Sequence, residues 1–244
     1  MTFKVLSYNI LLGGEDRLQR IADIIRREEP DAVALLEAND RANVTTLAHD
    51  LGMQLVFGEA NTEFHIAWLS RLPIHRWENH RLAALSKTLL EIEVRWAGLP
   101  VGLFATHLGS RHDRFRPEDE VPVILDVLRS LADAPHLLVG DFNALHPNDA
   151  VGTPPNGQEK RGEANEGVPR KAIQLMLEAG YVDCYHMLHP RQPGYTYPSH
   201  APWLRLDYVF ASSRLARHLT ACDSITGTAA EKASDHCPVW VAFS

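Results

Sequence analysis

Polar residues that could carry chemistry follow apolar, strand-like segments at several points along the chain. Each stands at or near the end of such a segment, and the set is Asn9, Glu37, His107, Asp141, Asn143, Asp207, Asp235 and His236. One such residue alone is typical of a turn or of a satisfied polar group in a core. A buried carboxylate without a partner or a metal is costly, however. If the strand ends converge, three or four carboxylates share one site, and their mutual repulsion calls for a cation.

The residue types indicate which cation and which reaction. Carboxylate and amide oxygens without cysteine favour Mg²⁺ or Mn²⁺ over zinc. Such a site with two histidines suits the hydrolysis of an anionic phosphoester, because the metal and the histidines stabilise charge on the phosphoryl oxygens. A serine-hydrolase mechanism is less supported, because the sequence has no Gly-x-Ser-x-Gly motif. It has no Walker A motif either.

The elements that must position these residues alternate between strand-like and helix-like patterns. Apolar runs predict strands at residues 3–10, 32–36, 88–94, 101–106, 137–139, 206–210 and 239–243. Apolar residues at helical spacing predict helices at residues 18–25, 121–131 and 172–179. Pro122 is tolerable in the first turn of the second helix, and Gly180 stops the third.

Composition narrows the class of protein. The 244 residues are 45% hydrophobic and 23% charged, which predicts one globular domain over residues 1–244. No apolar run approaches the length of a membrane span, and polar residues come too early for a signal peptide, so we expect a cytoplasmic protein without integral membrane association. The net charge of −7 disfavours tight non-specific binding of nucleic acid. The three cysteines are odd in number and lack CxxC spacing, so neither a disulfide framework nor a zinc ribbon is indicated.

Seven short motifs occur in order over residues 7–239. They are Ser-Tyr-Asn-Ile, Leu-Leu-Glu, Ser-Arg-Leu-Pro-Ile, Thr-His-Leu, Gly-Asp-Phe-Asn-Ala, Arg-Leu-Asp-Tyr-Val-Phe and Ser-Asp-His-Cys-Pro-Val. Together they resemble the endonuclease/exonuclease/phosphatase superfamily, whose members include deoxyribonuclease I, repair exonucleases, neutral sphingomyelinases and inositol-polyphosphate 5-phosphatases. The resemblance implies a four-layer α/β sandwich, with two packed mixed β-sheets flanked by helices and the site at one edge.

The resemblance also implies a role for each candidate residue. The main metal ligand would be Glu37, with Asn9 and Asp235 close by. The attacking water would be oriented or deprotonated by Asp141 and positioned by Asn143. The phosphate oxygens would accept hydrogen bonds from His107 and His236, and Asp207 would hold His236 in the required tautomer.

Some departures from the repair-endonuclease branch affect the expected substrate. Leu11 stands where that branch has a second acid, Leu-Leu-Glu replaces Leu-Gln-Glu, and His107 replaces a tyrosine, as in the deoxyribonuclease and sphingomyelinase branches. We therefore expect a Mg²⁺- or Mn²⁺-dependent phosphoesterase, a monomer, with a small or lipid-like phosphodiester or phosphomonoester as substrate. A water activated by the metal and Asp141 would cleave the phosphoester by in-line attack. The alternatives are a nuclease acting on DNA or RNA and a catalytically silent binding module of the same fold.

Weaker features carry further hypotheses. Arg111 and Arg114 could form a basic lip over the substrate, or a loop that the acids at 118–120 neutralise. Glu63 could pair with His107, although an exposed loop acid is the preferred interpretation. Cys237 is expected to be a small buried filler. The Gly- and Pro-rich residues 145–169 could form a mobile lid over the substrate or an insertion without a role.

Overall fold

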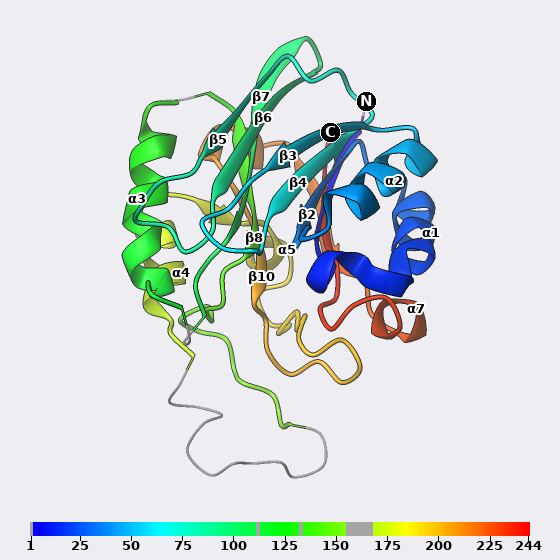
Figure 1. Ribbon diagram of the computed structural model, residues 1–244. Coiled ribbons are helices and arrows are strands. Elements are labelled where there is room, and N and C mark those ends of the chain that lie inside the picture. Colours follow the sequence, from blue (N-terminus) through cyan, green and yellow to red (C-terminus); the bar gives the residue numbers. More distant parts are fainter. Residues whose placement is uncertain (1, 111–112, 132–133, 155–167) are drawn as a thin grey trace.

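Two six-stranded sheets pack face to face in a computed structural model of the chain, and helices cover both outer faces (Figure 1). The structure describes residues 2–110, 113–131, 134–154 and 168–244. The strand order is β11-β12-β1-β2-β4-β3 in the first sheet and β5-β6-β7-β8-β10-β9 in the second. Pairs β1/β2 and β7/β8 are parallel and the others antiparallel, so both sheets are mixed. This arrangement is the expected four-layer α/β sandwich.

The strands match the apolar runs where these are long. The first sheet consists of β1 (Phe3–Asn9), β2 (Ala32–Leu36), β3 (Gln54–Gly58), β4 (Ile66–Ser70), β11 (Leu219–Ser224) and β12 (Val239–Phe243). The second consists of β5 (Arg76–His80), β6 (Leu89–Trp96), β7 (Leu99–His107), β8 (His136–Asp141), β9 (Val182–Asp183) and β10 (Asp207–Ala211). Strand β2 is buried along its whole length, as its unbroken apolar run predicts.

Helices flank the two sheets or pack at their edges. They are η1 (Leu12–Arg17), α1 (Leu18–Glu28), α2 (Arg41–Leu51), α3 (Pro117–Arg129), α4 (Lys171–Glu178), α5 (Cys184–Leu188), α6 (Ser213–Ala216) and α7 (Thr228–Glu231). Apolar residues of α1 and α2 pack on the outer face of the first sheet, and those of α3 and α4 on that of the second. The central core lies between the sheets, with Phe3 and Trp68 from one and Leu103 and Val139 from the other. No helix among the described residues is long and apolar enough to cross a membrane.

Helix α3 begins earlier than the sequence pattern indicates. It starts at Pro117, so Pro122 lies inside the helix and not in its first turn, which corrects the expectation. The acids Glu118, Asp119 and Glu120 occupy that first turn, where the helix dipole favours negative charge. They are therefore part of a helix, and Glu118 Oε1 lies 3.8 Å from Arg116 Nε, so the segment compensates part of its own charge.

Candidate active site

Strand register brings three of the candidate residues to one edge of the second sheet. Asp141 ends β8, and its Cα partners are His107 on parallel β7 and Asp207 on antiparallel β10. Asn9 ends β1 of the facing sheet, and its side-chain amide reaches across to Asp141, with 3.4 Å between Nδ2 and Oδ2. The site therefore spans both sheets at the edge where these strands end.

A carboxylate pair surrounds the ring of His236. Nδ1 lies 2.8 Å from Asp207 Oδ2, and Nε2 lies 3.7 Å from Asp141 Oδ2. Burial opposes protonation of the ring, but the charges of Asp207 and Asp141 outweigh burial and raise the pKa of His236 to about 10. The ring is therefore an imidazolium at neutral pH, with Nδ1 donating to Asp207.

Asp141 lies at the centre of the cluster, and its two oxygens face different neighbours. Oδ1 accepts a hydrogen bond from the backbone N–H of Asn143 at 2.9 Å, and Oδ2 lies 3.5 Å from His107 Nε2. Burial is the main cause that raises the pKa of Asp141, to about 7; Asp207 and Glu37 add to the rise, while His236 opposes it. Asn143 has a positive φ of 46° and donates from Nδ2 to the carbonyl oxygen of Leu108 at 3.0 Å.

An oxygen-rich group of side chains lies beside Asp141. Asn9 Nδ2 donates to Glu37 Oε1 at 3.2 Å, and the N–H of Leu12, at the start of η1, donates to Glu37 Oε2 at 3.0 Å. Asp235 is half-buried, and its neighbour Ser234 donates to the Asn9 carbonyl oxygen at 2.6 Å, which joins this segment to the end of β1.

This group fits a hard divalent cation. Burial and then the carboxylates of Asp235, Asp141 and Glu37 raise the pKa of the Tyr197 hydroxyl, so all three acids act on this side chain. The acids offer carboxylate oxygens, whereas Asn9 turns its Nδ2 to Glu37 and Asp141 and accepts the Leu11 N–H on its Oδ1. Mg²⁺ and Mn²⁺ prefer oxygen ligands.

His107 is also buried, but its surroundings differ from those of His236. Its Nδ1 has no hydrogen-bond partner among the described residues, and its ring meets Phe64 edge-on at 6.1 Å. Burial, with smaller contributions from Lys87 and His236, lowers the pKa of His107 well below its ordinary value. The ring is therefore neutral. Glu63 is exposed, and no ion pair or hydrogen bond between described side chains joins it to His107.

The sequence analysis missed Lys87, a buried lysine beside the site. Its Nζ donates to Asp113 Oδ2 at 2.9 Å and to the Leu108 carbonyl oxygen at 3.3 Å. The same carbonyl accepts the amide of Asn143, so Lys87 and Asn143 hold one backbone oxygen between them. A lysine between polar residues ahead of a strand is typical of a surface position, so the sequence carries no signal for this burial.

The structure describes only some of the residues on which the weaker hypotheses depend. Arg111 lies outside the described residues, while Arg114 is exposed and stacks over Phe115 at 4.9 Å, away from any contact with the candidate cluster that the structure describes. Residues 155–167 of the proposed lid also lie outside the described residues. Cys237 is buried, as expected for a filler.

Comparison with known proteins supports the fold and the motifs. The sequence model of the Endonuclease/Exonuclease/phosphatase family matches residues 6–236. Similar solved structures include an AP endonuclease from Archaeoglobus fulgidus, with 20% identity and a TM-score of 0.76 over 99% of each chain. A variant of the 3′ phosphatase NExo from Neisseria, bound to a product DNA hairpin, has 20% identity and a TM-score of 0.77 over 99% of each chain. A family protein from Leptotrichia buccalis C-1013-b has 17% identity and a TM-score of 0.73, again over 99% of each. No curated protein matches the chain.

Proposed function

The chain belongs to the endonuclease/exonuclease/phosphatase family, and from this membership and its site we propose that it is a Mg²⁺- or Mn²⁺-dependent phosphoesterase. The proposed substrate is a small or lipid-like phosphodiester or phosphomonoester, and residues 1–244 act as one catalytic domain in a monomer. The observation that carries the proposal is the convergence of Asp141 with the Asp207–His236 pair and with the Asn9 amide, whose Nδ2 donates to both Asp141 and Glu37.

The cation would be held by Glu37, with Asn9 and Asp235 close by, and it would offset negative charge on the phosphoryl oxygens. Asp141 would orient the attacking water and accept its proton, because the pKa of Asp141 near 7 lies close to the operating pH of a general base. Asn143 would help to position the same water, since its backbone N–H fixes the other oxygen of the Asp141 carboxylate.

The two histidines would donate hydrogen bonds to the phosphate in different charge states. His236 is an imidazolium held by Asp207, so its Nε2–H adds positive charge where negative charge develops. His107 is neutral and would donate from one ring nitrogen, with a single tautomer allowed at a time. Both rings lie within 4 Å of Asp141 Oδ2, so a phosphate bound beside Asp141 would lie near both of them.

The charges around the site favour a compact substrate over a long nucleic acid. Lys87 is paired with Asp113, and Arg205 with Asp149 and Asp183, so these cations are bound to partners inside the fold. The net charge of −7 adds a general repulsion of polyanions. A nuclease stays as the second candidate, because the solved relatives include an AP endonuclease and a phosphatase bound to DNA.

A substrate panel tests the proposal. p-Nitrophenyl phosphate, bis-p-nitrophenyl phosphate, sphingomyelin and plasmid DNA are each assayed with Mg²⁺, Mn²⁺ or EDTA. We expect metal-dependent turnover of one of the first three and slower turnover of DNA. Faster cleavage of DNA would favour the nuclease, and no turnover with either metal would favour a binding module. Asp141→Asn serves as the inactive control, because it removes the proposed base with little change of shape.

A further inference from the structure

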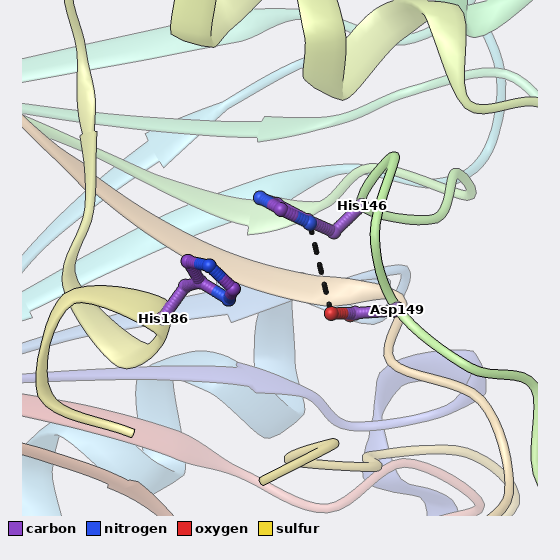
Figure 2. Close-up of side chains that lie close together, drawn as sticks. All are labelled: His146, Asp149 and His186. Atoms are coloured by element: carbon purple, nitrogen blue, oxygen red, sulfur yellow. Dashed lines mark ion pairs between the residues drawn. The ribbon is translucent and has the colours of Figure 1, made fainter. Parts of the chain in front are cut away.

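A second group of metal-ligand side chains lies beyond the end of β8. His146 and Asp149 stand on the loop that follows Asn143, and His186 stands on the short helix α5. Figure 2 shows the two imidazole rings facing each other, with the Asp149 carboxylate beside them. One ligand atom from each of the three residues lies within 4.8 Å of the other two.

The distances are close to those of a metal centre. His146 Nδ1 lies 3.7 Å from Asp149 Oδ1. The rings of His146 and His186 stack, with 4.3 Å between their centroids and 24° between their planes, so one ring would turn to aim a nitrogen at the ion (Figure 2). Zinc bound to nitrogen and oxygen at about 2.0–2.2 Å in a tetrahedron sets its ligand atoms roughly 3.3 Å apart. A movement of under about an ångström would therefore bring His146 Nδ1 and Asp149 Oδ1 to the ligand spacing of such a centre.

The fold holds this loop firmly in place. Arg205 Nε donates to Asp149 Oδ2 at 2.7 Å, which orients the carboxylate and leaves Oδ1 for the histidines. Arg170 donates to three backbone carbonyl oxygens of the same loop, those of His146, Pro147 and Asp149. A ligand carboxylate fixed by a neighbouring donor is the usual surrounding of a metal site.

Protonation and charge in the group also suit a cation. His146 is buried. Its Nδ1 accepts the backbone N–H of Asn148 at 3.1 Å, so that nitrogen carries the lone pair that a metal would take in place of this hydrogen bond. Arg205 is positive, but Asp149 and Asp183 both pair with it, so the three charges leave one negative charge in excess.

We propose that His146, Asp149 and His186 form a zinc-binding site, separate from the site at Asp141. Two imidazoles and one carboxylate form the donor set that zinc takes in proteins, whereas Mg²⁺ prefers oxygen ligands alone. Three protein ligands leave a fourth position for water. The ion would join the loop after β8 to α5, and so fasten the residues that follow Asn143.

Zinc binding tests the proposal on protein that has been freed of metal with chelator. Isothermal titration with Zn²⁺ is carried out in the Glu37→Gln background, which removes the proposed main ligand of the catalytic cation. We expect His186→Ala to weaken one zinc site at least tenfold. His49→Ala is the matched control, because His49 is 89% exposed and lies on α2. We expect it to leave zinc affinity unchanged.

A spectroscopic measurement on the unmutated protein makes the result independent of the folding of any variant. Long-range ¹H–¹⁵N spectra resolve the ring nitrogens of histidines, and one equivalent of Zn²⁺ should shift a ring nitrogen of both His146 and His186. The same concentration of Mg²⁺ should leave them unmoved. Unshifted ring nitrogens at saturating zinc, or equal affinity in His186→Ala and His49→Ala, would overturn the proposal. Neither outcome bears on the phosphoesterase, which the substrate panel tests.

Discussion

The substitution Asp207→Asn tests the electrostatics of the His236 ring. Asp207 Oδ2 is the nearer of two carboxylate oxygens, at 2.8 Å from Nδ1, against 3.7 Å from Nε2 to Asp141. The rise of the His236 pKa from 6.5 to about 10 corresponds to about 5 kcal/mol in favour of the charged ring. One adjacent opposite charge supplies about 1–3 pKa units, so the variant should lose about that much.

The sign of the effect on stability follows from the raised pKa. The folded-state pKa of His236 lies above its unfolded value, so the stabilisation is complete below about pH 6.5 and is lost as the pH rises towards 10. In Asp207→Asn this loss should be complete at a lower pH. Activity should also fall at a lower pH on the basic side, because the imidazolium that donates to phosphate disappears earlier.

NMR titration of the His236 ring in metal-free protein measures the pKa directly, and denaturant unfolding across the same pH range measures the stability. Asp223→Asn is the control, because Asp223 is an exposed acid on β11. A His236 midpoint that is the same in Asp207→Asn as in the control would refute the pairing as the cause of the raised pKa.

Three further substitutions probe the metal group, the buried lysine and the close approach of two strands. Glu37→Gln should weaken Mn²⁺ binding in calorimetry and lower the rate of hydrolysis by two or more orders of magnitude, since a metal supplies several kcal/mol of transition-state stabilisation. Unchanged Mn²⁺ affinity would show that Glu37 is not a metal ligand. Lys87→Met removes one of two donors to the Leu108 carbonyl oxygen. It should lower kcat about tenfold, because a hydrogen bond to a charged group contributes about 1.5–3 kcal/mol, and Lys87→Arg should recover part of the lost kcat. Equal kcat in the unmutated protein and both variants would contradict a positioning role. Gly140→Ala would drive a Cβ into the backbone oxygen of Thr106 on β7, at a φ of 151°, and should cost roughly 3 kcal/mol or more of unfolding free energy. Gly52→Ala, at a φ of 64° with open space around it, should cost about 1–2 kcal/mol, and similar losses in the two variants would count against the clash.

The sequence predicted the layers of the fold where the apolar pattern was strong. The unbroken run at residues 32–36 became β2, buried throughout, and the amphipathic residues 18–25 lie in α1. Helix α2 escaped the analysis because Thr45 and Thr46 weaken its pattern. Its ends carry readable signals, however: Asp40 caps the first turn, and Gly52 closes the last in a left-handed conformation. The polar strand β5 has no such signal, because it lies at a sheet edge and is fixed by pairing with β6.

The sequence was enough to select the candidate residues, but not their hydrogen bonds, burial or protonation states. Motif order and strand ends were enough to select Asp141 and His107, and the register β7–β8–β10 brings them together with Asp207. Register depends on tertiary pairing, so the hydrogen bonds of Asp141 could not be derived from periodicity. The burial of Lys87 was hidden for the same reason, since its partner Asp113 lies on a distant loop.

The two histidines show why the surroundings of a motif matter to its chemistry. His107 and His236 are equally buried and approach the same oxygen of Asp141, yet burial with Lys87 keeps one ring neutral while Asp207 keeps the other charged. A phosphate between them would therefore meet one cationic and one neutral donor. The neutral ring supplies a hydrogen bond without adding positive charge, whereas the imidazolium supplies both. The two rings would therefore act on the phosphoryl oxygens by different means, His236 through its charge and His107 through a neutral hydrogen bond.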